Sequence, residues 1–411
     1  MPDLLILLFV FAFGACVGSF LNVVVWRLPR GESLVTPPSR CPKCGHKLAA
    51  YDNVPVLGWL WLRGRCRYCK TAISSRYPIV EAVCGGLFVL YYICYFDLQL
   101  GPCAATPRVL NFRQDWPIYC LHMFMIAALL AASLIDADLF IIPAEIPWLM
   151  AGVGVAVHAI IAAPGQPGSL LVGVEAGALA AGALAGWLIS LLLLRLRWLG
   201  ISFPQGEPML DVDREAAQQQ IDEARRRGEN PVPLPPVYTR RQLYGELTKE
   251  IAFLLPPMLL AAGFWLATTR IPAVGQLWAR AVAQPWVAGA LGAVLGAMVG
   301  AILVWVTRIL GTFAFRRLAM GLGDVHLMFG VGAVVGAGAV TVAFFLAPFG
   351  GMVIALYLLI FGKRREIPYG PYLSLGTAAT LLFYCRIADW LAPGLEGLAA
   401  SFRGLLGSAG G

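Results

Sequence analysis

Charged residues are scarce in this sequence. Only 13% of its 411 residues are charged, whereas 59% are hydrophobic and the mean hydropathy is +0.73. A soluble domain carries roughly 25% charged residues, so this composition excludes an ordinary soluble globular protein. The sequence instead predicts a polytopic helical membrane protein.

Two further absences narrow the expected function. No basic residue precedes the first apolar run, so the basic start of a cleaved signal peptide is missing and we expect this run to remain as a membrane span. The net charge is +8, yet no basic segment is interleaved with aromatic residues as a nucleic-acid groove would be. Basic loops that face anionic lipid headgroups account for the charge, and we expect no nucleic-acid partner.

Apolar runs of roughly 18 or more residues, enough to cross a bilayer core of about 30 Å, recur along the chain. The ten candidates are Leu4–Trp26, Ile79–Phe96, Ile118–Ile135, Ile146–Ala163, Leu170–Leu194, Ile251–Thr268, Trp286–Val306, Leu327–Ala347, Phe349–Phe361 and Tyr372–Leu391. The ninth is short and abuts the eighth. The sequence therefore predicts an all-α bundle of about 8–10 transmembrane helices.

The distribution of Lys and Arg predicts the orientation, because short cytoplasmic loops collect basic residues. Arg27 and Arg30 follow the first span, which places the N-terminus outside and the segment after it inside. Alternation then places the segments that begin at Asp136 and Thr307 inside as well. Residues 136 and 324 are therefore both expected on the cytoplasmic side.

Two aspartates stand at the ends of predicted spans. Asp136 closes the run Met123–Ile135, and Asp324 ends the turn Gly321-Leu322-Gly323-Asp324 before the run Leu327–Pro348. Carboxylates at such positions are costly unless they face protein or water, so a functional role is the default hypothesis. Two carboxylates on one membrane face suggest a hydrolytic pair. The alternative is two interfacial charges in water.

Four cysteines form two C-x-x-C knuckles, Cys41 with Cys44 and Cys66 with Cys69. This double knuckle is a strong signal for tetrahedral thiolate ligation of zinc, although the interval is slightly longer than in most zinc ribbons. Disulfides are disfavoured in the cytoplasm, so a metal explains the cysteines better than bridges do. His46 is a competing ligand, but we expect it beside the knuckle.

The other six cysteines have no pattern. Cys103, in an outer loop, is a lone candidate for oxidation. The remaining five read as small apolar packing residues, namely Cys16, Cys84, Cys94, Cys120 and Cys385.

With these motifs in place, the chain resembles the type IV prepilin peptidases, the membrane aspartic proteases of pilus and type II secretion systems. The resemblance rests on motifs in the order the family has them. They are Gly18-Ser19-Phe20-Leu21-Asn22 with Arg27-Leu28-Pro29, the two knuckles with Asp52-Asn53-Val54-Pro55, Arg76-Tyr77-Pro78, Ile135-Asp136-Ala137-Asp138 with Pro143, Gly321-Leu322-Gly323-Asp324, and Pro368-Tyr369-Gly370-Pro371-Tyr372.

The resemblance implies a bacterial inner-membrane protein that cleaves prepilins or pseudopilins between a basic leader and a hydrophobic helix, at the cytoplasmic membrane face. It implies that Asp136 and Asp324 are the catalytic pair. Relatives with the cysteine knuckles also methylate the new N-terminus with S-adenosylmethionine. Methylation here rests on the resemblance alone, and the sequence gives no oligomeric state.

Several neighbours are candidate supporting residues. Gly321 and Gly323 would let the backbone turn tightly and approach the substrate. Asp138 points away from Asp136 on a helix, so it either binds water or is a solvated charge. His326 stands where the family has lysine and either adds a positive charge or is a plain interfacial histidine. His122 and His158 are expected to be packed and hydrogen-bonded.

The chain departs from the family in two places. After Pro143 the family has an acidic residue, whereas this chain has Ala144 with Glu145 next. A polar stretch, 201–250, includes a predicted helix (214–227) and a proline cluster (231–236), and reads as a cytoplasmic insertion. The expected organisation is a first helix (1–27), a zinc loop (28–77), a core (78–200), the insertion (201–250), an added helix pair (251–310), a second core (311–393) and a tail (394–411).

Two other classes of protein fit parts of the sequence. A transporter or channel would line an ion path with the acidic residues, but it would spread them through the membrane depth. A zinc-loop scaffold without catalysis would explain the cysteines and leave both aspartate motifs unexplained.

Overall fold

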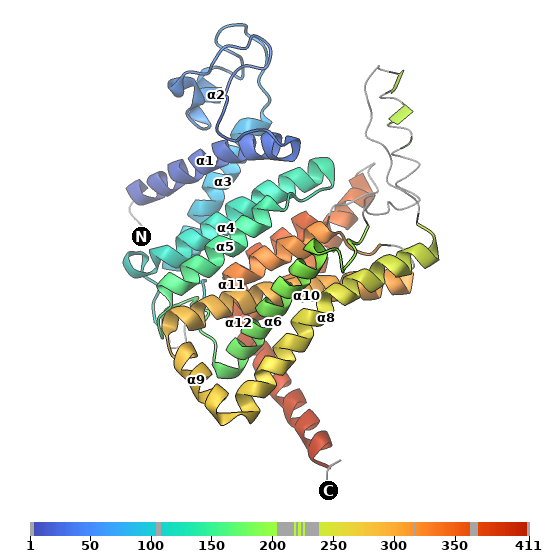
Figure 1. Ribbon diagram of the computed structural model, residues 1–411. Coiled ribbons are helices and arrows are strands. Elements are labelled where there is room, and N and C mark those ends of the chain that lie inside the picture. Colours follow the sequence, from blue (N-terminus) through green and yellow to red (C-terminus); the bar gives the residue numbers. More distant parts are fainter. Residues whose placement is uncertain are drawn as a thin grey trace. The chain divides into compact units, whose positions relative to one another are not determined.

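The computed structural model describes residues 4–103, 108–203, 218, 221–222, 225–226, 238–315, 318–361 and 369–408. The chain divides into two compact units. Unit 1 is Met1–Ala131, Gly165–Gly168 and Leu375–Gly411; unit 2 is Ala132–Pro164 and Ser169–Ser374. Within the described ranges the regular elements are helices, and extended pairing is limited to two isolated bridges. The predicted all-α class is confirmed (Figure 1).

Unit 1 is built on two helices that pack closely, α1 (Leu4–Arg27) and α3 (Arg76–Tyr92). A Cβ added to Gly14 would lie 2.9 Å from Cα of Gly85, and one added to Gly18 would lie 2.8 Å from Cα of Glu81. Small residues let apolar helices approach until their backbones touch, which is how helices associate in lipid. The side chain of Asn22 adds a hydrogen bond of 3.2 Å to the carbonyl of Tyr77.

The rest of unit 1 includes a short π-helix, η3 (Ile93–Asp97), the first part of α4 (Phe112–Leu139) and most of α12 (Gly370–Ser408). Its interior polar groups are paired. The Tyr95 hydroxyl lies 2.7 Å from Nδ1 of His122, and the Tyr119 hydroxyl donates to the carbonyl of Phe88. The prediction that His122 is packed and hydrogen-bonded is confirmed.

A disulfide joins Cys103 to Cys385 in unit 1, with 5.6 Å between the Cα atoms. The prediction that Cys385 is a simple packing residue is therefore wrong, and the oxidation expected of Cys103 has a partner 282 residues away. No local spacing reveals such a pair. The other four patternless cysteines are free thiols; Cys84 and Cys94 are buried, whereas Cys16 and Cys120 are exposed.

Unit 2 contains α5 (Glu145–Ile161), α6 (Val174–Arg195), α8 (Arg240–Arg270), α9 (Pro272–Val282), α10 (Pro285–Phe315) and α11 (Leu322–Phe361). Figure 1 shows α10 beside α11 and α6 beside α8. Glycines bring these pairs into backbone contact. A Cβ on Gly296 would lie 2.0 Å from the carbonyl oxygen of Gly332, and a Cβ on Gly186 would lie 2.3 Å from that of Pro256.

Helix α5 packs against both α10 and α11. A Cβ on Gly154 would lie 2.7 Å from the carbonyl oxygen of Ala333, and Nε2 of His158 lies 2.9 Å from that of Val334. The hydrogen-bonded role predicted for His158 is confirmed. These contacts fix the direction of α11, whose first turn carries Asp324.

Seven helices among the described residues are long and apolar enough to cross a membrane, as the sequence led us to expect of a multi-pass protein. They are α1 extended to Arg30, α3 extended to Asp97, α4, α6, α8, α10 and α11 as far as Met352. Helix α5 is apolar but only 17 residues long. The eighth and ninth predicted spans are not separate helices, because both fall in α11, whose one non-helical residue is Gly336.

The boundaries of the added material also differ from expectation. Helix α8 begins at Arg240, inside the stretch predicted as polar insertion, where Thr239 and Gln242 form a capping box. Helix α9 was not foreseen, and α12 continues to Ser408 through most of the predicted tail. The proline cluster 231–236 and most of the predicted helix 214–227 lie outside the described residues.

Candidate functional site

The four patterned cysteines meet in unit 1. Their sulfur atoms all lie within 4.8 Å of one another, with 3.8 Å between Sγ of Cys41 and Cys69 and 4.0 Å between Sγ of Cys44 and Cys66. Tetrahedral zinc with Zn–S bonds of about 2.3 Å places its sulfurs about 3.8 Å apart. The donor set and its spacing therefore fit a metal ion, and these four residues would hold it.

The two knuckles have the same backbone construction. The amide of Cys41 donates to the carbonyl of His46 at 2.9 Å, and the amide of Cys66 donates to that of Thr71 at the same distance. An isolated antiparallel bridge closes each hairpin, Arg40 with Lys47 and Arg65 with Ala72. The repeated turn aims two sulfurs from each hairpin at a common point.

Backbone amides favour a thiolate in this cluster even before a metal binds. Hydrogen bonds from the backbone of Cys44 and of Lys43 lower the pKa of the Cys41 thiol to about 6. For Cys44 a backbone hydrogen bond from His46 is outweighed by burial and by the neighbouring cysteines, which raise its pKa to about 11, so the cluster favours one thiolate. A thiolate is the form that ligates a metal. His46 lies beside the knuckle as predicted, stacked on Tyr68 with 3.7 Å between the ring centroids.

The segment between the knuckles is held by an ion pair. Both carboxylate oxygens of Asp52 accept from Nε of Arg67, at 3.0 and 2.9 Å, and Asp52 is buried. The Arg67 guanidinium lowers the pKa of Asp52 below its usual value. Because Arg67 lies inside the second knuckle, this pair ties the two halves of the loop together.

Glu81 connects the loop to the membrane helices of unit 1. Its Oε2 accepts a hydrogen bond of 2.6 Å from the backbone amide of Val56, and the side chain is buried at the start of α3. The structure assigns Glu81 to the zinc loop.

Asp136 and Asp324 both belong to unit 2, and both are buried, with 6% and 8% of their surface exposed. Asp136 lies near the end of α4, where its Oδ2 accepts a hydrogen bond of 3.0 Å from the amide of Gly370. Asp324 lies in the first turn of α11, where its Oδ2 accepts one of 3.3 Å from the amide of Gly321. Neither carboxylate is therefore an interfacial charge exposed to water.

The residues at the start of α12 interact with both carboxylates. Gly370 binds Asp136, and the preceding residue, Tyr369, has its pKa raised by burial and by the charge of Asp324. Ile142 adds a second connection, since a Cβ on Gly323 would lie 3.2 Å from its Cβ and a Cβ on Gly370 would lie 3.1 Å from its Cδ1. One small cluster therefore includes the surroundings of both aspartates.

The close approach to substrate expected of the two turn glycines stays a prediction. Neither Gly321 nor Gly323 is among the described residues with a left-handed backbone. What Gly323 provides is space, because a side chain there would press on Ile142. The hydrogen bond from Gly321 to Asp324 is a use of that position that the sequence did not suggest.

The other two predicted supporting residues occupy different surroundings. Asp138 is exposed, whereas Asp136 two residues earlier is buried, as the helical spacing predicted. His326 is half-buried, with its ring centroid 6.3 Å from that of Trp148. Its influence on the aspartates stays a prediction.

A pocket of about 230 Å³ opens beside the first turn of α11, within unit 2. It is lined mainly by apolar and aromatic side chains from α5, α6, α8, α10 and α11. The lining includes three indoles, those of Trp148, Trp187 and Trp305, together with Lys249, Leu322 and His326.

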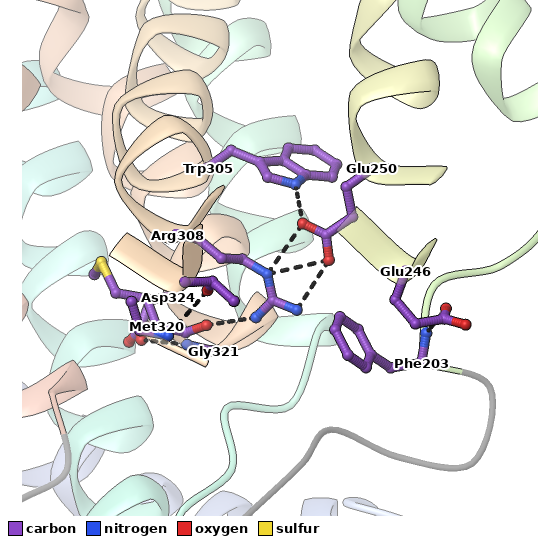
Figure 2. Close-up of polar contacts among 10 residues, drawn as sticks. Phe203, Glu246, Glu250, Trp305, Arg308, Met320, Gly321 and Asp324 are labelled. Atoms are coloured by element: carbon purple, nitrogen blue, oxygen red, sulfur yellow. Dashed lines mark hydrogen bonds and ion pairs between the residues drawn. The ribbon is translucent and has the colours of Figure 1, made fainter. Parts of the chain in front are cut away.

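Sequence reasoning missed a buried ion pair next to the Asp324 turn. Arg308 of α10 is fully buried, and its Nη2 lies 2.9 Å from Oε1 of Glu250 on α8 (Figure 2). The available signal was one acidic and one basic residue at the ends of the two added spans. Charges there tend to pair with one another.

These observations define a class: a multi-pass helical membrane protein with a four-cysteine loop that can hold a metal ion, and a cluster around two buried aspartates. Comparison with known proteins shows which members of this class the chain resembles. Residues 12–95 match the family model described as the bacterial peptidase A24 N-terminal domain. The resemblance to the prepilin peptidases is confirmed over that part of the chain.

Curated relatives agree with this match. The chain is 40% identical over 151 residues to a prepilin leader peptidase/N-methyltransferase of Myxococcus xanthus, covering 36% of this chain and 39% of the relative. It is 35% identical over 179 residues to the protein of that name from Burkholderia pseudomallei strain 1026b, covering 37% and 52%. A third, from Aeromonas salmonicida, is 41% identical over 106 residues, covering 20% and 36%. The chain thus spans about half or less of these relatives' length. No solved structure matches the chain.

Proposed function

We propose that this protein is a membrane aspartic endopeptidase that removes the basic leader of type IV prepilins or pseudopilins at the cytoplasmic face of a bacterial inner membrane. The observation that carries the proposal is that Asp136 and Asp324, far apart in the sequence, are both buried, and that Ile142 lies against both Gly370, which binds Asp136, and Gly323, which precedes Asp324. The relatives' names support the substrate class.

The proposed chemistry needs the two carboxylates to share one proton, because close like charges resist joint ionisation. The ionised member takes a proton from water as the water oxygen attacks the scissile carbonyl carbon. The protonated member donates a hydrogen bond to the carbonyl oxygen as it gains charge. The intermediate then breaks its C–N bond, and a carboxyl group gives its proton to the leaving amine. The two groups titrate as one coupled pair.

The pocket beside the first turn of α11, the turn that carries Asp324, suits the apolar side of such a substrate. Its three indoles and its apolar walls would hold the start of the pilin's hydrophobic helix, while basic leader residues stay toward water. The peptide bond to be cut must be extended there, because a helical peptide bond is shielded by its own hydrogen bonding. Extending one short segment has an entropic cost that the pocket's contacts would offset.

We further propose that the four cysteines hold Zn²⁺ as a structural ion and that the protein methylates the new N-terminal amine with S-adenosylmethionine. Zinc would cross-link the two hairpins of the loop, which otherwise share little apolar core. Methylation is supported by the second half of the relatives' name, N-methyltransferase. Labelled methyl donor should therefore be incorporated into a cleaved pilin-like peptide; cleavage without label would leave the peptidase alone.

The decisive test compares Asp136→Asn and Asp324→Asn with the exposed Asp138→Asn, using a purified model prepilin. Each of the first two variants should lose cleavage while remaining folded and membrane-inserted, and Asp138→Asn should retain it. Cleavage that survives both substitutions would contradict the proposal. A transporter would instead lose ion flux in these variants, and a zinc-loop scaffold would lose neither activity.

A further inference from the structure

The peptide group between Met320 and Gly321 connects the buried guanidinium of Arg308 to the carboxylate of Asp324. The carbonyl oxygen of Met320 accepts a hydrogen bond from Nη1 of Arg308. The amide of the next residue, Gly321, donates to Oδ2 of Asp324 at 3.3 Å. Figure 2 shows this line of contacts from Arg308 through the peptide group to the carboxylate.

Arg308 is fixed from its other side by α8. Its Nε lies 3.2 and 3.1 Å from the two carboxylate oxygens of Glu250, and its Nη2 lies 2.9 Å from Oε1. Trp305 donates to the same carboxylate at 2.9 Å, and the ring of Phe203 lies 5.4 Å from the guanidinium carbon. Both members of the pair are almost wholly buried.

Such burial has a cost that calls for an explanation. Removing two charges from water costs several kcal/mol per ion, and an ion pair regains this only with good geometry and further hydrogen bonds. Well-packed apolar residues would often stabilise a fold as well or better. Here the guanidinium directs a further donor, Nη1, at the backbone directly before the Asp324 turn.

A second contact holds the same backbone one residue earlier. Oγ1 of Thr312, one helical turn beyond Arg308, accepts a hydrogen bond of 3.2 Å from the amide of Ala319. Thr312 is also fully buried. The last turns of α10 therefore hold two successive residues that lead into α11.

We propose that Arg308, oriented by Glu250, is a positioning residue that holds the Met320–Gly321 peptide so that its N–H fixes the carboxylate of Asp324. This inference rests on the proposed peptidase function. It also assigns a purpose to the added helix pair, because Glu250 comes from α8 and Arg308 from α10. The two added helices therefore position one of the two aspartates, in addition to enlarging the helix bundle.

The physical effect has two parts. A cation on the carbonyl oxygen polarises the peptide group and strengthens its N–H as a donor toward a carboxylate. The same contact removes rotational freedom from the turn, so Asp324 reaches the substrate already oriented. A displacement of about 1 Å in such a group lowers a catalytic rate on the order of 100-fold.

The test uses full-length protein and Arg308→Lys. Lysine keeps a cation against Glu250, so the buried carboxylate remains paired. One ammonium group does not reproduce the guanidinium fork, which bonds the carboxylate and Met320 at once. We expect kcat for a model prepilin to fall about 10- to 100-fold with KM changed less than about twofold. The exposed Arg280→Lys serves as the matched control and should keep wild-type kinetics.

A double variant, Arg308→Met with Glu250→Gln, separates positioning from folding. It removes both buried charges with similar side-chain volumes, so its melting temperature should match or exceed that of Arg308→Met alone. Its kcat should stay low. Wild-type kcat in Arg308→Lys, or in a double variant that folds, would overturn the inference. Wild-type protein that fails to cleave prepilin would instead refute the peptidase proposal, and Asp324→Asn in the same assay gives the baseline.

Discussion

The amide of Gly370 donates a hydrogen bond of 3.0 Å to Oδ2 of Asp136, although 234 residues separate them in the chain. Gly370 starts α12, and a Cβ at this position would lie 2.6 Å from that oxygen and 3.1 Å from Cδ1 of Ile142. The carboxylate and the helix start fit together only because no side chain intervenes.

Gly370→Ala should therefore displace the Asp136 carboxylate. We expect cleavage of a model prepilin to fall on the order of 100-fold, since a catalytic group moved by about 1 Å loses its alignment. The matched control is Gly394→Ala, also in α12, because a Cβ there meets no atom within 4 Å. Both variants should be compared at equal amounts of membrane-inserted protein. Full activity in Gly370→Ala would show that this contact does not orient the carboxylate.

Tyr369 belongs to the same cluster, and its contribution to catalysis should not depend on pH near neutrality. Burial, followed by the charge of Asp324, raises the pKa of its phenol, so the phenol stays protonated and can donate a hydrogen bond. We expect Tyr369→Phe to lower kcat about tenfold, equal to about 1.4 kcal/mol of transition-state stabilisation. The loss should be the same from about pH 6 to 8, because a phenol already titrates near 10 without any shift. A loss confined to one end of this range would assign the effect to another group.

The features that could be predicted from the sequence are those that depend on residues close together in the chain. Each C-x-x-C knuckle is one turn, so the pairing of Cys41 with Cys44 and of Cys66 with Cys69 could be read directly. The meeting of the two knuckles followed from the chemistry of zinc. Long apolar runs located the helices, since a bilayer fixes their length. Asp136 and Asp324 stood out because charge at a span boundary needs a partner or water.

The remaining features depend on residues brought together from distant segments. The contact of Ile142 with both Gly323 and Gly370 has no periodic signal. Arg308 and Glu250 looked like two boundary charges, and only the packing of α8 and α10 around them shows that they are a pair. The sequence left the division between the eighth and ninth spans open, and the structure places the non-helical residue of α11 at Gly336 and not at Pro348.

The cysteine loop predicts a dependence on metal. Purified protein should contain about one zinc per chain, and Cys66→Ser should lose most of it because three thiolates leave the tetrahedral site open. Cys16→Ser, a free and exposed cysteine of α1, should retain the metal. Elemental analysis after gel filtration measures this content. His46→Ala should also keep its zinc, since this ring stacks on Tyr68; a loss of metal there would make His46 a ligand.

The bridge between Cys103 and Cys385 predicts a covalent loop of 282 residues and gives a test of orientation. Disulfides persist outside the cytoplasm, which agrees with the outer side predicted for the loop that carries Cys103. In intact cells without an outer membrane, an impermeant maleimide should label these two cysteines only after reduction. Cys103→Ser should run more slowly on a non-reducing gel than wild type and be less stable by about 2–4 kcal/mol. Cys94→Ser, which removes a free buried thiol, should leave the gel mobility unchanged. Labelling that requires a broken inner membrane would reverse the assigned orientation, and with it the side on which cleavage is proposed.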